Sequence, residues 1–216
     1  MEKTDRDSSL YDIVLQVGLV LVMIFSYLFM HDVPKRVLAK LRLRNRADIQ
    51  AKRHFVHGAQ LLARARSSKS RPMAKEAQAQ AQQAIALDPN DAAPHLLKAL
   101  ALDFLGLRSA ALDSLDEALS SRAAKSLTDM ERGDALLKRA ELRLGTSQRG
   151  RVDSALDDLT ESIKLSPNNA KAFCALGECY ERKKMNEDAI KAYKEALRLE
   201  PQLRVAQQAL HNLENN

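Results

Sequence analysis

The hydrophobic pattern of this chain has two parts. Residues 13–30 form an apolar run without a single charged side chain. From about residue 49 onward, apolar residues instead recur every three or four positions, which is the spacing of amphipathic helices. The pattern therefore predicts an all-α chain: one apolar segment, then a series of helices that each bury one face.

The clearest helical pair lies at residues 170–203. The apolar stripe of its first helix consists of Phe173, Leu176 and Tyr180, and that of its second helix of Ile190, Tyr193 and Leu197. We expect the turn at residues 184–186 and the end of the second helix at Pro201, because proline cannot continue a helix. Gly177 and Ala189 are small, so the two helices can approach closely.

This spacing resembles the tetratricopeptide repeat family. The matching residues are Ala170, Phe173, Leu176, Gly177, Tyr180, Ala189, Tyr193, Ala196 and Pro201. One period of about 34 residues upstream of Pro201 lies Pro167, and Pro89 closes an earlier unit. The resemblance covers residues 49–203. It implies a right-handed superhelix of about four helix-turn-helix repeats, because a single helical hairpin cannot bury both of its faces.

The repeats are expected at about residues 49–91, 92–125, 129–169 and 170–203, with a capping helix at 204–216. Within them we expect an enlarged turn from Ser67 to Pro72, with Pro72 opening the next helix, and a turn at Gly106. Asp129 is the expected N-cap of the third repeat. Its cap is only partial, because Arg132 stands where a capping-box acid would be.

Composition agrees with an all-helical chain. The 216 residues include no Trp and are 45% hydrophobic. Cys174 and Cys179 lie five apart on one expected helix and point in different directions. This argues against a disulfide scaffold and indicates structural thiols in a reducing compartment.

The net charge of +6 is unevenly distributed. Residues 35–53 hold eight basic residues against Asp48 alone, a net charge of +7, so the rest of the chain sums to −1. Two interpretations stay open: a helix lying on an anionic membrane surface, or a stop-transfer cluster without lipid selectivity. A nucleic-acid patch is not favoured, because aromatic residues are not interleaved. The expected membrane-surface residues are Lys35, Arg36, Lys40, Arg42, Arg44 and Arg46.

Residues 13–30 are predicted to be a retained transmembrane anchor, between a polar N-terminus at 1–12 and a basic juxtamembrane linker at 31–48. As a helix, the eighteen residues would rise about 27 Å, near the thickness of a hydrocarbon core. A cleaved signal peptide fits poorly, because the residues before the run are acidic. The positive-inside rule places the repeats in the cytosol. The chain is thus expected to be a single-pass protein of the endoplasmic reticulum or an organelle outer membrane.

Residues that would indicate catalysis are missing. The sequence has no Gly-rich phosphate loop, nucleophile elbow or metal-spaced Cys/His set. His54 and His57 lie three apart without a third ligand, and the acidic pairs 116–117 and 157–158 are interpreted as solvated faces. We therefore expect no enzymatic activity, no cofactor and no metal.

The family resemblance implies that function resides on the concave surface lined by the first helix of each repeat. The expected groove residues are Leu97, Leu100, Phe104, Lys138, Glu141, Lys171, Glu178 and Arg182. For the apolar ones, packing against the neighbouring repeat is the alternative. Family members that bind acidic chaperone tails use asparagines at positions that are Ala59 and Leu97, or Leu100 and Lys138, in this chain, so chaperone-tail binding is not favoured.

The leading functional hypothesis is a membrane-anchored, cytosol-facing adaptor that holds a partner protein in its groove. The alternative is a permanent structural or assembly subunit of a membrane protein complex. A charged groove favours the first and an apolar groove the second.

Overall fold

The computed structural model describes residues 16–23, 27, 33–145 and 150–214, with the side chains of residues 33–45 outside the description. The chain divides into two units, Met1–Ile49 and Gln50–Asn216. Helix α2, Val33–Ser68, begins in the first unit and continues into the second.

The predicted transmembrane anchor is wrong. None of the helices among the described residues combines the length and the apolar character needed to cross a membrane. Within the apolar run, the described residues are 16–23 and 27, and all of them are helical. The single-pass membrane localisation and its cytosolic orientation depended on this anchor, and they fall with it. Positions 13–15, 24–26 and 28–30 lie outside the described residues.

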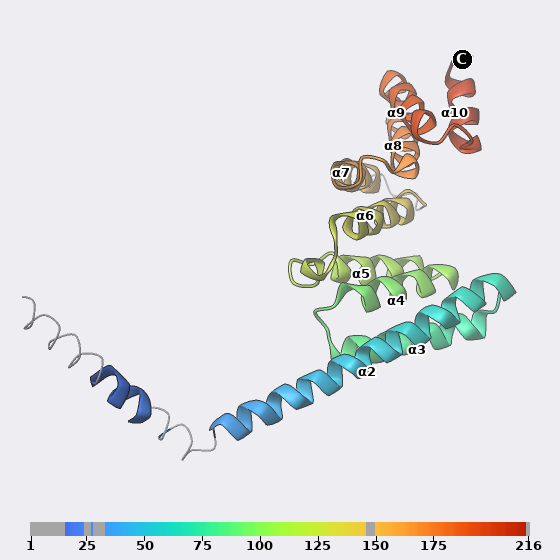
Figure 1. Cartoon of the computed structure of the whole chain (residues 1–216). Helices are drawn as coiled ribbons and strands as arrows, with labels where there is room; N and C mark the ends of the chain where they lie inside the picture. The colour runs from blue at the N-terminus through green and yellow to red at the C-terminus, as the bar shows by residue number, and fades with distance from the viewer. Residues whose placement is uncertain (1–15, 24–26, 28–32, 146–149, 215–216) are drawn as a thin grey trace, which may run out of the picture. The chain divides into compact units, whose positions relative to one another are not determined.

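The second unit is built from helices, as the sequence pattern predicts. After α2 come α3 (Arg71–Leu87), α4 (Ala92–Phe104), α5 (Arg108–Ala118), the short 3₁₀ helix η1 (Ala123–Ser126), α6 (Asp129–Leu144), α7 (Gly150–Leu165), α8 (Ala170–Arg182), α9 (Asn186–Leu199) and α10 (Arg204–Glu214). Successive helices pack against one another, and Figure 1 shows the pairs stacked in chain order as a helical solenoid. The all-α class is confirmed.

Small residues set the distance between paired helices. A Cβ atom added to Gly177 of α8 would lie 2.6 Å from Cε1 of Tyr193 on α9, far inside van der Waals contact. At Gly58 of α2 it would lie 3.1 Å from Cβ of Gln80 on the paired helix α3, and 2.9 Å from Cδ2 of Leu97 on α4 of the next repeat. The close approach predicted at Gly177 is confirmed, and the space left by its missing side chain is filled by the buried tyrosine ring.

Three of the turns between paired helices have the same geometry. A residue one or two positions past the first helix has a positive φ: 52° at Lys69, 82° at Gly106 and 60° at Lys184. The next N–H donates to a carbonyl five residues back, in the pairs Ser70–Ala65, Leu107–Leu102 and Met185–Tyr180. This is the Schellman motif, which satisfies carbonyls left free at a helix C-terminus.

The enlarged turn predicted at residues 67–72 is wrong, because the first helix extends further than expected. Ser67 and Ser68 are helical, and both hydroxyls donate to the carbonyl of Arg64, at 2.9 and 2.8 Å. The turn itself is short, and Pro72 lies in the first turn of α3 as expected.

Arginine side chains connect successive repeats at the same turns. Nη2 of Arg71, the first residue of α3, donates to the carbonyl of Leu105 at the end of α4, at 2.9 Å. Nη1 of Arg108, the first residue of α5, donates to the carbonyl of Gly145 at the end of α6, at 2.7 Å. A cation at a helix C-terminus also interacts favourably with the helix dipole.

The N-terminus of α6 is capped by a different residue from the one predicted. The N-cap is Thr128, which forms a complete capping box with Glu131. The Thr128 hydroxyl accepts from the Glu131 N–H at 3.3 Å, and the Glu131 carboxylate accepts from the Thr128 N–H at 2.9 Å. The Glu131 carboxylate also accepts from the Thr128 hydroxyl at 2.8 Å. The two bonds to the carboxylate, the one from the Thr128 backbone first, lower the pKa of Glu131. The expectation of a partial cap at Asp129 is therefore wrong by one residue.

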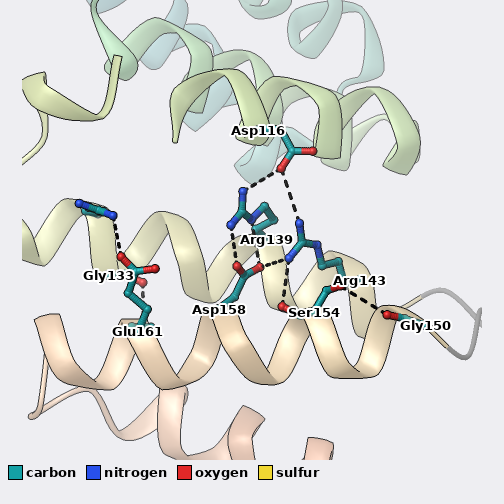
Figure 2. A network of polar contacts seen from close by, with 10 residues as sticks. Asp116, Gly133, Arg139, Arg143, Gly150, Ser154, Asp158 and Glu161 are labelled. Carbon is teal, nitrogen blue, oxygen red and sulfur yellow. Dashed lines mark hydrogen bonds and ion pairs between the residues drawn. The ribbon is translucent and has the colours of Figure 1, made fainter. Parts of the chain in front are cut away.

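A buried carboxylate joins α5, α6 and α7 (Figure 2). Asp158 of α7 is 4% exposed. It accepts from Nε and Nη2 of Arg139 at 3.0 and 2.6 Å, and from Nη1 of Arg143 at 2.6 Å. Both arginines belong to α6 and also face Asp116 of α5, at 2.8 and 3.6 Å. The interpretation of residues 157–158 as a solvated face is wrong at Asp158, whose charge is satisfied by these two guanidinium groups.

We predict that Gly177→Leu destabilises the fold by about 1–3 kcal/mol, because the new side chain must displace the Tyr193 ring. The measurement is the thermal midpoint of the full-length chain by circular dichroism. The matched control is Gly150→Leu, since a Cβ atom at Gly150 would meet nothing within 4 Å. Equal midpoints for the two variants would contradict the close approach.

We also predict that Asp158→Asn destabilises the fold by about 3 kcal/mol, because two partly buried guanidinium groups lose their shared counter-charge. Asp157→Asn, at the exposed neighbouring position, should change stability by less than about 0.5 kcal/mol. Urea unfolding of both variants measures the difference. A tolerated Asp158→Asn would mean that Asp116 alone satisfies the arginines.

Candidate functional site

A groove of about 780 Å³ lies between the first helices of the third and fourth repeats. Its wall from α6 consists of Met130, Asp134, Leu137, Lys138 and Glu141, whose spacing of three and four residues places them on one helix face. The opposite side is lined by residues 165–171 and by Leu199 and Glu200 at the end of α9. We call this cavity the groove.

Two sets of contacts hold the groove in shape. Asn169 is the N-cap of α8, where its side-chain oxygen accepts from the Ala172 N–H at 3.3 Å. Its side-chain nitrogen donates to Asp134 of α6 at 3.0 Å. The Ser162 hydroxyl donates to the carbonyl of Gly133 at 2.7 Å. The Asn169–Asp134 bond fixes the loop before α8 against α6, and the Ser162–Gly133 bond joins α7 to α6, so the groove is preformed.

Lys138 is neutralised by acids from two repeats. Its ammonium nitrogen lies 2.8 Å from Asp103 of α4 and 3.3 Å from Glu141. Partial burial acts to lower the pKa of Lys138, but the hydrogen bond and the charge of Asp103, together with Glu141, leave that pKa raised. Lys138 is therefore protonated at neutral pH and serves partly as a link between the second and third repeats.

Lys171 lies on the same groove in a different electrostatic setting. It is exposed in the first turn of α8, and among the described residues it has no ion pair. The structure thus brings three predicted groove residues together, Lys138, Glu141 and Lys171. Of these, Lys171 offers a positive charge to a ligand without first breaking an internal contact.

Glu178 and Arg182 lie further along α8, outside the groove lining. Arg182 forms an ion pair with Glu178 and donates to the carbonyl of Leu144 at the end of α6. The structure therefore uses this pair to connect the third and fourth repeats.

The apolar residues predicted for the concave surface lie between the first two repeats. Leu97 is 5% exposed and packs in a cluster with Leu61 and Leu62 of α2. Leu100 and Phe104 are half-buried against the same cluster. They do not line the groove. These three residues therefore pack against the neighbouring repeat.

The predicted membrane-surface residues are described only in part. The side chains of Lys35, Arg36, Lys40, Arg42 and Arg44 lie outside the described residues, whereas Arg46 is exposed.

Sequence reasoning missed several residues of the groove. Asp134 and Met130 precede Lys138 by four and eight residues, so helical periodicity could have placed them on its face. Glu200 and the loop residues 165–169 gave no such signal, because their position depends on how the repeats stack.

The cysteine and histidine side chains described here have structural roles. Cys174 and Cys179 are free thiols, and burial raises their pKa values to about 11 and about 12, so both are protonated at neutral pH. Nδ1 of His54 is hydrogen-bonded to Gln80 of α3 at 2.7 Å. Within the described ranges, His, Cys, Asp and Glu side chains form no group of three that could hold a metal ion.

Comparisons with known proteins agree with this arrangement. The tetratricopeptide repeat model matches residues 170–203. No curated protein matches the chain at a significant level.

Similar solved structures indicate the fold. The 41-end chain of MamA from Desulfovibrio magneticus RS-1 superposes with a TM-score of 0.63 at 22% identity, over 77% of this chain and 84% of that MamA chain. The structure of pilF from Pseudomonas aeruginosa superposes with a TM-score of 0.62 at 19% identity, over 80% of this chain and 69% of the pilF chain. A thermophilic TPR protein of Thermus thermophilus superposes with a TM-score of 0.56 at 20% identity, over 76% of this chain and 81% of that chain. The chain therefore carries a tetratricopeptide repeat at residues 170–203, within a helical solenoid that has the fold of tetratricopeptide-repeat proteins.

Proposed function

We propose that this protein is a scaffold that binds a segment of a partner protein in the groove. The observation that carries the proposal is the preformed groove of about 780 Å³, with an apolar floor and charges of both signs on its rim. Leu137 and Leu165 supply the floor, and Asp134, Glu141 and Lys171 supply the rim. Concave sites with a few placed polar groups are the usual form of a binding site.

The dimensions and polarity of the groove suit an extended or helical peptide. Apolar side chains of the segment would cover Leu137 and the exposed Met130, which is 69% exposed. A carboxylate of the segment would pair with Lys171. Such a charge contributes specificity and association rate more than raw affinity. Binding of this kind has no chemical step and uses no cofactor.

A permanent structural or assembly subunit is the second candidate, and the exposed apolar residues favour it. Val56, Leu107 and Met130 are each more than half exposed, and a partner that never dissociates would keep them covered. Salt-sensitive, reversible capture supports the scaffold, whereas recovery of a complex that resists salt supports the structural subunit.

We predict that Lys171→Glu weakens capture of partner proteins several-fold at low salt and less at moderate salt, because exposed charges are screened. The measurement is a pull-down with the full-length chain at both salt concentrations. Lys171 is preferable to Lys138, whose reversal would also break the contact with Asp103.

The matched control is Lys125→Glu, an exposed lysine of η1 that does not line the groove. Circular dichroism should show both variants folded, since exposed charges contribute little to stability. Identical partner recovery by wild type and Lys171→Glu at both salt levels would refute a role for the rim charge.

A further inference from the structure

The first helical pair is the most basic part of the described chain. Between Asp48 and Glu76 the sequence contains no acidic residue and seven basic ones. These are Lys52, Arg53, Arg64, Arg66, Lys69, Arg71 and Lys75. Residues 88–216, in contrast, hold 19 basic and 21 acidic residues, a net charge of −2.

Five of these cations gather at the turn between α2 and α3. The basic tip, as we name it, consists of Arg64, Arg66, Lys69, Arg71 and Lys75, and all five are exposed. None of them lines the groove. The basic tip is therefore a surface separate from the groove.

The cations of the basic tip differ from those of the later repeats in their partners. Arg132 pairs with Glu161, Arg139 with Asp158, and Lys183 with Asp153. Within the part of the chain that the structure describes, no residue of the basic tip forms an ion pair. Five cations without an ion pair among the described residues therefore concentrate positive potential at this one turn.

The backbone that carries these cations is ordered by local bonds. Lys69 has a φ of 52°, and the Ser70 N–H donates to the carbonyl of Ala65 at 3.0 Å. The hydroxyls of Ser67 and Ser68 bond to the Arg64 carbonyl, and Arg71 anchors the start of α3 to the end of α4. A ligand therefore meets a preformed turn, which reduces the ordering cost of binding.

We propose that the basic tip binds an acidic segment of a protein partner, independently of the groove. Arginine forks match carboxylates with paired hydrogen bonds, and repeated carboxylates along one segment could engage several tip cations together. Proteins that hold single-stranded nucleic acid add aromatic rings on which bases stack. Residues 64–75 contain no aromatic residue, so the charge complementarity favours a carboxylate-rich peptide.

The test compares two triple variants of the full-length chain that lose the same charge. The tip variant is Arg64→Gln, Arg66→Gln and Lys69→Gln. The control variant is Lys125→Gln, Lys164→Gln and Arg204→Gln, at exposed positions outside the basic tip. The probe is a fluorescein-labelled poly-glutamate peptide of about twelve residues, and its anisotropy is titrated at low ionic strength, where exposed charges act most strongly.

We expect the tip variant to bind the peptide about tenfold more weakly than wild type, and the control variant to differ by less than about twofold. Matching circular dichroism spectra show that folding is unaffected. Equal weakening in both variants would overturn the proposal, because binding would then follow net charge alone. Tighter binding of a single-stranded oligonucleotide of equal charge would also overturn it, in favour of nucleic acid.

Discussion

The solenoid depends on the contact between a small residue on one helix and a large side chain on its neighbour. Gly177 against the Tyr193 ring and Gly58 against Leu97 are two examples, and neither leaves room for a Cβ atom. Alanine is the commonest buried residue, so the same close spacing continues through the other pairs. Each alanine buries little apolar area, however, and area determines the hydrophobic contribution. Stability must therefore come from many such contacts and from the polar bonds between repeats.

Contacts within one helical pair could be predicted from sequence, whereas the polar bonds between repeats could not. The apolar stripes, the small residue at position 177 and the turn at Gly106 follow from local spacing, because each reflects contacts within one helical pair. The role of Asp158 could not be predicted in this way. Its arginine partners lie on the preceding helix, and an acidic residue on a second helix has the same local pattern whether it faces solvent or a neighbour.

The same limit applies to the groove. Lys138, Glu141 and Lys171 were placed on it by their positions along first helices, and the structure brings them together. Asp103, which neutralises Lys138, lies in another repeat, and only the stacking of repeats reveals the pair. The transmembrane prediction failed for a different reason. It rested on the composition of residues 13–30, whereas no helix among the described residues is both long enough and apolar enough to cross a membrane.

The arginines at the starts of α3 and α5 have a consequence for how the solenoid forms. In a nearest-neighbour description of repeat proteins, their bonds belong to the interface between repeats and not to either repeat alone. Both bonds also point the same way along the chain, from an earlier repeat to the first helix of the next. During synthesis from the N-terminus, Arg71 and Arg108 therefore exist before the helices whose ends they complete. The C-termini of α4 and α6 can therefore each bond to an arginine that has already been synthesised.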